Sequence, residues 1–561
     1  MPSSDLCAWG VCLSPLVVEG ERLFGFAEYL AALALMVLAW TTADVRYRFR
    51  IRIAPLPLRG ITFAVVASVG LLTLLTDVWV ADRLLVPRGD LITTAQWRAV
   101  LGLLFLITFL LWAWFAFIQP PTFRPANAKR FAQALYASIL KGDQNELAVI
   151  ADELASSMPS LVRHAPTRRG NEEPLSEAAQ YAHDILLLIA DRRFCRAIVA
   201  RSPGTALSLF VEMAELEKYD IGIETFGQNL VAEALDNRDS FLFHETEGYQ
   251  TGFMGYLKPL SSAIFANYRL VEDVGSLLDP WWDTKWDASQ WRAYCRITLL
   301  TFKSYMDAGR GQHSYVLHRA IHHISRSADD LYTLDGIDNA RWDSDPMQRL
   351  SASLEFIKDA VVQMDGFLPP RIYLRIRERA SWRRSMADLL ADAALELMCV
   401  AATVKSPKSL AWTVQHNKTW RTFFNFGSLS GPAGKVFKFK LRRLIFDRIK
   451  VLERFGDYQA AYLLGLCLNV MGLELLKFKN LDHDMDSRAL HQALLNWTRK
   501  NYASLHLRDP YVAQACLLEG LSFDEANNRL CRESGLGRRF EKTVTSLKLD
   551  PPAPPLSNRN S

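Results

Sequence analysis

Two histidines have the residue type and spacing of a metal site. His318 and His322 are four residues apart, which places both imidazoles on one face of a helix. Imidazole is the commonest protein ligand of metal ions, and Asp329 and Asp330 follow within reach as oxygen ligands. The helix lacks the glutamate of a zincin motif. Ordinary surface or hydrogen-bonded histidines are therefore the alternative interpretation.

A second polar cluster, at residues 244–248, holds groups suited to proton transfer. His244 is followed by Glu245 and Glu247, and a histidine beside carboxylates can act in general acid–base catalysis. The adjacent Gly248 suits a simple turn equally well. Because no nucleophile or metal partner stands at a fixed spacing, the cluster does not define an active site. The sequence as a whole favours a protein without enzymatic activity.

Residues 430–435, Ser-Gly-Pro-Ala-Gly-Lys, resemble a phosphate-binding loop only in their last positions. Leu429 occupies the place of the first glycine, and Val436 stands where a Ser or Thr would hold magnesium. A nucleoside triphosphatase of this type is excluded, although a looser anion-binding turn remains open. We predict no cofactor.

The positive charge of the chain is concentrated in its second half. The net charge is +5, whereas residues 371–384 carry +5 and residues 418–454 carry +8, so the remainder is acidic. Three interpretations remain open: contact with anionic lipids of the inner leaflet, contact with nucleic acid, or a solvated face of core helices. The residues expected to form this basic surface are Arg371, Arg375, Lys438, Arg442, Arg443 and Lys450.

Three apolar runs follow one another before residue 120. They cover residues 23–41, 61–80 and 99–119, and each has about 20 residues, the length of helix that crosses a hydrocarbon core of about 30 Å. Tryptophans lie near the ends of these runs, as in the aromatic belts of membrane proteins. The sequence predicts three transmembrane helices, with residues 1–22 as a tail outside the cytoplasm.

Arginines predict the orientation of these helices. The loop between the first two runs holds Arg46, Arg48, Arg50, Arg52 and Arg59, whereas the next loop has fewer basic residues and two acids. Short loops rich in Lys and Arg stay in the cytoplasm. We therefore predict a multi-pass protein of the inner (plasma) membrane, with its N-terminus outside and everything after residue 119 in the cytoplasm.

Two acids, Glu28 and Asp77, interrupt the apolar runs near their predicted outer ends. An ionisable residue inside a membrane is often functional, for instance as a cation or proton site. The alternative is an interfacial carboxylate that pairs with a neighbour such as Arg22. Because the runs hold few other polar residues, they favour an anchor over a pore.

The eight cysteines fall into two groups. Cys7 and Cys12 lie in the predicted outer tail, where an oxidising compartment would allow a disulfide, and unpaired thiols are the alternative. The others are expected to be buried thiols in a reducing compartment; they are Cys195, Cys295, Cys399, Cys467, Cys516 and Cys531.

After residue 125 the pattern is helical, with few strand-like stretches. Phe131, Leu135 and Ile139 recur on one helix face, Gly142 closes that helix, and Asp143 begins the next. The expected fold class is all-α: three transmembrane helices followed by a large cytoplasmic helical array, α-solenoid-like or an irregular bundle. Its expected parts are a helical subdomain at 126–366, a basic helical subdomain at 371–548 and a disordered proline-rich tail at 549–561.

These features predict a membrane-anchored scaffold or sensor whose cytoplasmic region binds a protein partner or the inner leaflet. One alternative is a membrane-tethered, metal-dependent enzyme that uses His244, Glu245 and Glu247, or His318 and His322. Another is a membrane-bound nucleic-acid-binding protein that works through residues 371–454.

Overall fold

The computed structural model describes most of the chain as helices that form two compact units. The units are Met1–Glu233 and Ala234–Ser561. The described residues are 6–8, 11–15, 24–41, 44–82, 85–87, 93–167, 174–245, 259–279, 285–309, 313–337, 343–367, 385–425, 427–454, 456–475, 485–534 and 543–552. The predicted border between subdomains at 366–371 stays a prediction, because residues 368–384 lie outside the described part.

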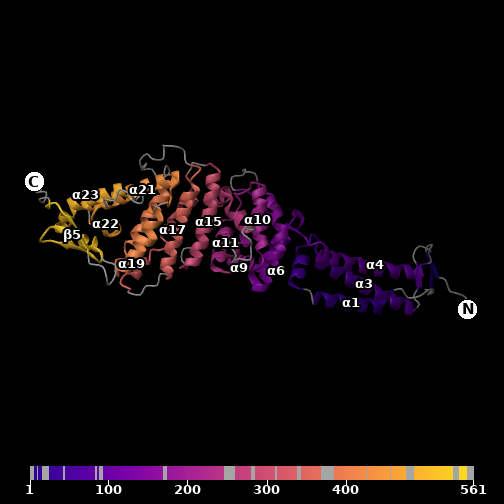
Figure 1. Cartoon of the computed structure of the whole chain (residues 1–561). Coiled ribbons are helices and arrows are strands. Elements are labelled where there is room, and N and C mark those ends of the chain that lie inside the picture. Colours follow the sequence, from indigo (N-terminus) through magenta and orange to yellow (C-terminus); the bar gives the residue numbers. More distant parts are fainter. Residues whose placement is uncertain are drawn as a thin grey trace, which may run out of the picture. The chain divides into compact units, whose positions relative to one another are not determined.

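The first unit begins with three apolar helices that run side by side (Figure 1). They are α1 (Phe26–Thr41), α3 (Leu58–Ala81) and α4 (Thr94–Ala113), and α4 continues as a π-helix, Trp114–Ile118. Within the described residues, α3 and the extended α4 are long and apolar enough to cross a membrane. The 16-residue α1 is shorter, and it reaches this length only if it is counted together with α2 (Val45–Ile53), the helix that follows it.

A glycine lets α1 and α3 approach closely. A Cβ atom on Gly70 of α3 would lie 2.5 Å from the Tyr29 ring of α1, well inside van der Waals contact. The Tyr29 hydroxyl donates to the carbonyl of Val66 at 3.0 Å, and its ring meets Phe105 of α4 edge to face. Tyr29 therefore joins all three helices from the middle of their shared core.

A small antiparallel sheet connects the N-terminal tail to the second loop. Strands β1 (Leu6–Ala8) and β2 (Val11–Pro15) pair so that Cys7 is opposite Cys12, and β2 pairs with β3 (Leu85–Pro87). The tail that the sequence predicts at residues 1–22 thus contains two strands. The register agrees with the proposed disulfide, which stays a prediction.

Helix hairpins make up the rest of the first unit. Helices α5 and α6 pack on α8 and α9, respectively, and α2 packs against both α5 and α6. Asp143 begins α6 as expected, accepting a hydrogen bond from Glu146 N at 2.8 Å, and Gly142 ends α5. The helices are α5 (Ala128–Lys141), α6 (Gln144–Leu154), α7 (Met158–His164), α8 (Glu177–Leu188), α9 (Arg192–Arg201), α10 (Pro203–Glu215) and α11 (Glu224–Asp236), which contains the division between the units.

The second unit is a helical array that ends in a sheet. Its helices are α12 (Phe241–His244), α13 (Pro259–Phe265), α14 (Tyr268–Val274), α15 (Ala288–Asp307), α16 (Tyr315–Ser325), α17 (Asp345–Gln363), α18 (Met386–Ala401), α19 (Lys408–Trp412), α20 (Arg421–Phe424), α21 (Pro432–Lys450), α22 (Tyr458–Met471), α23 (Met485–Arg508) and α24 (Pro510–Ala515). A π-helix, Thr413–Trp420, joins α19 to α20. Figure 1 shows α15 beside α17.

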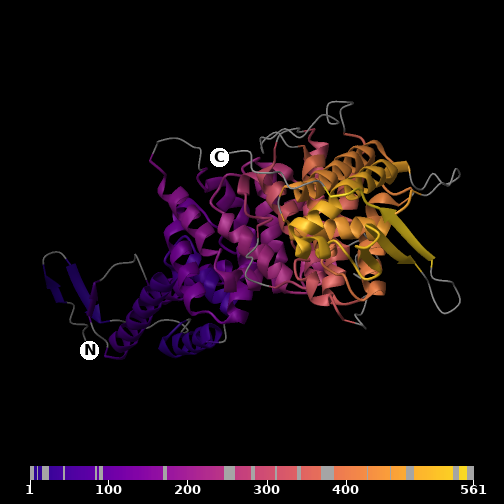
Figure 2. The ribbon, with the colours of Figure 1, turned by 90° about the vertical axis from the view of Figure 1, so that its left-hand side faces the viewer.

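The mostly helical fold class is thus confirmed, and a second sheet near the C-terminus is a further correction to it. Strands β4 (Leu521–Asp524), β5 (Arg529–Ser534) and β6 (Thr543–Lys548) form an antiparallel sheet, drawn as yellow arrows in Figure 2. The first hairpin turns at Asn528, whose positive φ of 47° is one that asparagine tolerates. Thr543, Val544 and Thr545 then supply β-branched residues that favour a strand.

Six cysteines of the described part are free thiols. Cys195, Cys295, Cys467 and Cys516 are buried as predicted, whereas Cys399 and Cys531 are partly exposed. Although Cys399 is partly exposed as a residue, desolvation of its thiol group raises the pKa of Cys399 to about 12, which keeps the thiol protonated and unreactive near neutral pH.

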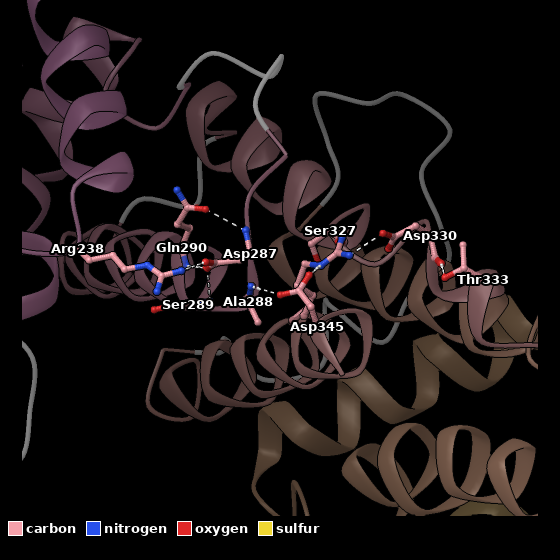
Figure 3. A network of polar contacts seen from close by, with 11 residues as sticks. Arg238, Asp287, Ala288, Ser289, Gln290, Ser327, Asp330, Thr333 and Asp345 are labelled. Carbon is pink, nitrogen blue, oxygen red and sulfur yellow. Dashed lines mark hydrogen bonds and ion pairs between the residues drawn. The ribbon is translucent and has the colours of Figure 1, made fainter. Parts of the chain in front are cut away.

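Hydrogen bonds hold the start of α15 in place (Figure 3). Asp287 accepts from the backbone amides of Ser289 and Gln290 at 2.8 and 3.0 Å, while the Gln290 amide oxygen accepts from Asp287 N. The Arg238 guanidinium also pairs with the Asp287 carboxylate. Burial opposes ionisation of Asp287, but these hydrogen bonds outweigh it and lower the pKa.

The same network extends from α15 to the start of α17 (Figure 3). Asp345 accepts from Ala288 N at 2.8 Å, and it also pairs with Arg349 one turn later. Arg349 reaches Asp330 at 2.6 Å and the carbonyl of Ser327 at 2.8 Å. The N-termini of two neighbouring helices are therefore joined through side chains.

The contact between α1 and α3 predicts opposite effects for two glycines of α3. Gly70→Ala should lower the unfolding free energy by about 1–3 kcal/mol, because the added methyl overpacks against Tyr29. Gly60→Ala is the matched control, since nothing lies within 4 Å of its Cβ position, and it should be neutral or stabilising because alanine is the better helix former. Thermal unfolding of the full chain in detergent measures both. Equal melting temperatures for the two variants would contradict the close contact.

The lowered pKa of Asp287 predicts a pH-dependent contribution to stability. The ionised carboxylate stabilises the fold above the unfolded pKa of about 3.9, and this contribution is lost as pH falls through the lower folded pKa. Asp287→Asn should lower the free energy of unfolding by about 1 kcal/mol at pH 7 and should leave it unchanged at the acid end of the titration. Asp239→Asn, which changes an exposed neighbouring acid, should cost nothing at either pH. A loss for Asp287→Asn that is constant down to pH 3 would contradict the assignment.

Candidate functional site

Helix α2 is the element that joins the apolar helices to the helical array of the first unit. It begins at Asp44, whose carboxylate caps Val45 N, and ends at Ala54, which the following Pro55 keeps extended. Its basic residues alternate with apolar ones, and the apolar Phe49, Ile51 and Ile53 are buried. We call α2 with its contacts on α5, α6 and the end of α4 the α2 junction.

On one face of α2, two arginines form ion pairs with two acids of α6. Arg50 forms a two-pronged pair with Glu153, at 2.6 Å from Nε to Oε2 and 2.7 Å from Nη2 to Oε1. Both side chains are nearly buried, at 12% and 8% exposure. Arg46 contacts the same Glu153 at 3.2 Å and the exposed Asp152 at 2.9 Å. Paired guanidinium and carboxylate groups of this geometry are among the stronger polar contacts in proteins.

Backbone carbonyls complete the α2 junction. Arg50 donates through Nη1 to the carbonyl of Ala116, in the π-helix that ends α4, at 2.9 Å. Asn127 donates to the carbonyl of Ile53 at 2.7 Å, and Arg130 to that of Pro55 at 2.7 Å. Side chains therefore satisfy the carbonyl of Ile53, which the end of α2 leaves without a helical partner, and the carbonyl of Pro55 just after it.

At the opposite end of the three helices, the two predicted acids act as caps. Asp77 of α3 accepts from Phe26 N at 3.0 Å and pairs with Arg98 of α4 at 2.7 Å. Glu28 accepts from Gly25 N at 2.9 Å. Both carboxylates thus hold the first turn of α1, and Asp77 finds its cation on α4. The predicted partner Arg22 lies outside the described residues.

The polar cluster at 244–248 is only partly described. Glu245 is buried, and its carboxylate accepts from the amides of Leu260 and Ser261 at 3.2 and 2.8 Å, which caps α13. His244 is exposed on the preceding helix, and Glu247 lies outside the described residues. Glu245 therefore has a structural role as the cap of α13. Acid–base catalysis by this cluster stays a prediction.

His318 and His322 lie on α16 as the sequence predicted, the first partly exposed and the second exposed. The proposed oxygen ligands are engaged elsewhere: Asp330 pairs with Arg349, and Asp329 pairs with Arg326 at 3.0 Å. Over the described ranges, no group of three or more His, Cys, Asp or Glu residues is arranged to hold a metal ion.

The basic surface differs from the prediction at one residue. Lys438 of α21 is 4% exposed and therefore belongs to the interior. Arg443 and Lys450 are exposed and Arg442 is partly exposed. Residues 371 and 375, both arginines, lie outside the described part.

The loop that resembled a phosphate-binding site already holds a carboxylate. Asp365 accepts from Ala433 N at 2.7 Å, at the first turn of α21. A Cβ atom on Gly431 would lie 1.9 Å from the same carboxylate. The glycine therefore admits Asp365, and an internal acid takes the place of an external anion.

Sequence reasoning missed the acids that face α2. Asp152 and Glu153 stand about one hundred residues after Arg46 and Arg50, and nothing local in an acidic pair on a helix indicates its distant partners. The alternation of arginine with apolar residues in 45–53 was the available indication, since it is unusual for a short exposed loop.

Comparison with family models, with curated proteins and with solved structures finds no match to this chain. The α2 junction is therefore interpreted from its own geometry.

The buried pair at the α2 junction predicts unequal roles for two adjacent acids. Glu153→Ala should lower the unfolding free energy by about 3 kcal/mol, because it leaves the nearly buried Arg50 without its partner. Asp152→Ala, the control beside it, should cost at most about 1 kcal/mol, since Asp152 is exposed. Chemical denaturation of the full chain in detergent measures both. Equal losses would contradict a special role for the Arg50–Glu153 pair.

Proposed function

We propose that this chain is an integral membrane protein in which three N-terminal helices anchor a cytoplasmic helical scaffold or sensor. The observation that carries the anchor is the apolar surface of α1, α3 and α4. Monomeric soluble proteins rarely expose contiguous apolar patches of this extent, and a bilayer is the environment that covers them. The most exposed large apolar side chains on these helices are Leu35, Leu38, Phe63, Leu71, Leu103 and Ile118.

Two contacts support the proposed orientation. The second loop pairs through β3 with the N-terminal tail, so both belong at one end of the helices. The first loop pairs through Arg46 and Arg50 with α6, so it belongs with the helical array at the other end. This grouping agrees with the loop charges, which favour the arginine-rich first loop in the cytoplasm.

The rest of the described chain supports a single anchor followed by a water-exposed region. Helix α22 is apolar but has only 14 residues, and most of its side chains are buried within the second unit. Stacked helix hairpins offer extended surfaces of the kind that bind other proteins. We therefore favour a protein, rather than nucleic acid, as the partner that binds this helical region.

Cysteine labelling of intact cells tests the orientation. In a Cys7→Ser/Cys12→Ser background, a cysteine placed at Ser3 should react with a membrane-impermeant maleimide. A cysteine at Ser557 should react only after lysis, because the C-terminus is expected in the cytoplasm. Labelling of the Ser557→Cys variant in intact cells would reverse the proposed orientation.

Metal analysis distinguishes the proposed scaffold from the alternative, a membrane-tethered, metal-dependent enzyme. The full chain purified in detergent without chelator should hold less than stoichiometric metal, and His318→Ala/His322→Ala should not change that amount. Stoichiometric metal that is lost in this variant would contradict the scaffold and favour a metal-dependent enzyme.

A further inference from the structure

The face of α2 that does not meet Asp152 and Glu153 lines a cavity. The cavity has a volume of about 390 Å³ and lies between α2 and the hairpin of α5 and α6. Arg48 and Arg52, one helical turn apart, reach it from α2, and Lys141 and Ser138 reach it from the end of α5. Glu146 of α6 is its acidic residue. We call this cavity the α2 pocket.

The α2 pocket has an excess of positive charge that the described fold does not neutralise. Arg48, Arg52 and Lys141 lack a side-chain hydrogen bond or ion pair to any described residue, and the pocket holds one carboxylate against these three cations. On the same short helix, Arg46 and Arg50 are both matched by acids. Like charges one helical turn apart repel each other, so the unmatched face would be stabilised by a bound anion.

The chemistry of the α2 pocket fits a phosphate ester. Two guanidinium groups and an ammonium group provide the donors that proteins use for phosphate oxygens. The volume is at the small end of ligand sites, which run from about 300 to 1,000 Å³, so it accommodates a headgroup-sized molecule. Glu146 limits the negative charge that the pocket accepts and can receive hydrogen bonds from ligand hydroxyls.

The α2 pocket also lies close to where the proposed membrane begins. Helix α2 stands between α1 and α3 in the chain, and Tyr47 on it contacts Phe117 near the end of the α4 span at 4.5 Å between ring centres. Basic groups beside the inner leaflet attract anionic lipids. A lipid headgroup and a soluble phosphate ester are thus two sources of the same chemical group.

We propose that the α2 pocket binds the phosphate group of an anionic, hydroxyl-bearing ester through Arg48, Arg52 and Lys141. The lipid source of this ester rests on the proposed membrane orientation, whereas the soluble source does not. Bound there, the ligand bridges α2 to α5 and α6, and so stabilises the α2 junction from the side that lacks acids.

Thermal unfolding of the full chain, purified in a neutral maltoside detergent, tests this proposal. Dioctanoyl-phosphatidylglycerol is the lipid probe, glycerol 3-phosphate the soluble probe and dioctanoyl-phosphatidylcholine the zwitterionic control. One of the anionic probes should raise the melting temperature in a concentration-dependent way. In Arg48→Gln/Arg52→Gln the apparent dissociation constant should rise about 25-fold, since each of the two basic groups contributes roughly a fivefold factor.

A matched control separates the α2 pocket from general charge effects. Lys129→Gln/Arg201→Gln removes the same amount of charge from exposed positions of the first unit and should keep the full response. Without any probe, Arg48→Gln/Arg52→Gln should melt at the same or a higher temperature than the parent, because its like charges are removed. If that variant does not fold, Lys141→Gln replaces it and should weaken binding about fivefold.

Each outcome is decisive. Protection by phosphatidylglycerol alone, lost in the pocket variant, supports a lipid headgroup, and protection by glycerol 3-phosphate with the same loss supports a soluble ester. No protection by either anionic probe would overturn the proposal, as would protection that the pocket variant retains or that the control variant loses equally. An outward C-terminus in the labelling experiment would remove the inner-leaflet source and leave the glycerol 3-phosphate result standing.

Discussion

The nearly buried pair between Arg50 and Glu153 is the contact on which the first unit depends. A guanidinium withdrawn from water needs a partner of opposite charge and acceptors for its remaining donors. Glu153 supplies the charge, and the carbonyl of Ala116 accepts from the remaining terminal nitrogen. Because these groups come from α6 and from the end of α4, the Arg50 side chain joins the first loop, the third apolar helix and the helix hairpins of the first unit.

The two ends of the apolar helices hold their charged groups in different ways. At one end, Asp77 and Arg98 pair beside the first turn of α1. At the other end, α2 turns away from the apolar helices and packs on α5 and α6 of the first unit. Between the ends the packing is apolar and close, and Gly70 leaves room for the Tyr29 ring. Charge is confined to the ends, which is where a helix that crosses a bilayer can keep it.

Hydropathy and helical period were enough to predict the helical fold class, the apolar helices and the hairpin at Gly142 and Asp143. These features are local, since they depend on residues a few positions apart. The C-terminal sheet was missed because its strands are short and follow long helical stretches. Lys438 was misplaced because a helical stripe drawn from α21 alone ignores the neighbours that surround that helix in the array.

Several acids at or beside the sites that sequence patterns proposed make structural contacts. Glu245 and Asp365 both cap helices, and Asp329 and Asp330 pair with arginines. Residue types alone could not separate these uses from catalysis, because a cap and an acid–base residue need the same carboxylate. The unmatched cations of the α2 pocket became visible only once the partners of Arg46 and Arg50 were known.

The most direct test of this account is a cross-link across the α2 junction in native membranes. Cysteines placed at Arg46 and Asp152, in a Cys7→Ser/Cys12→Ser background, should be joined by a short bis-methanethiosulfonate reagent. Mass spectrometry should then find the two peptides linked in inside-out vesicles. Modification of both cysteines without a link between them would show that the first loop does not contact α6, and would contradict the α2 junction.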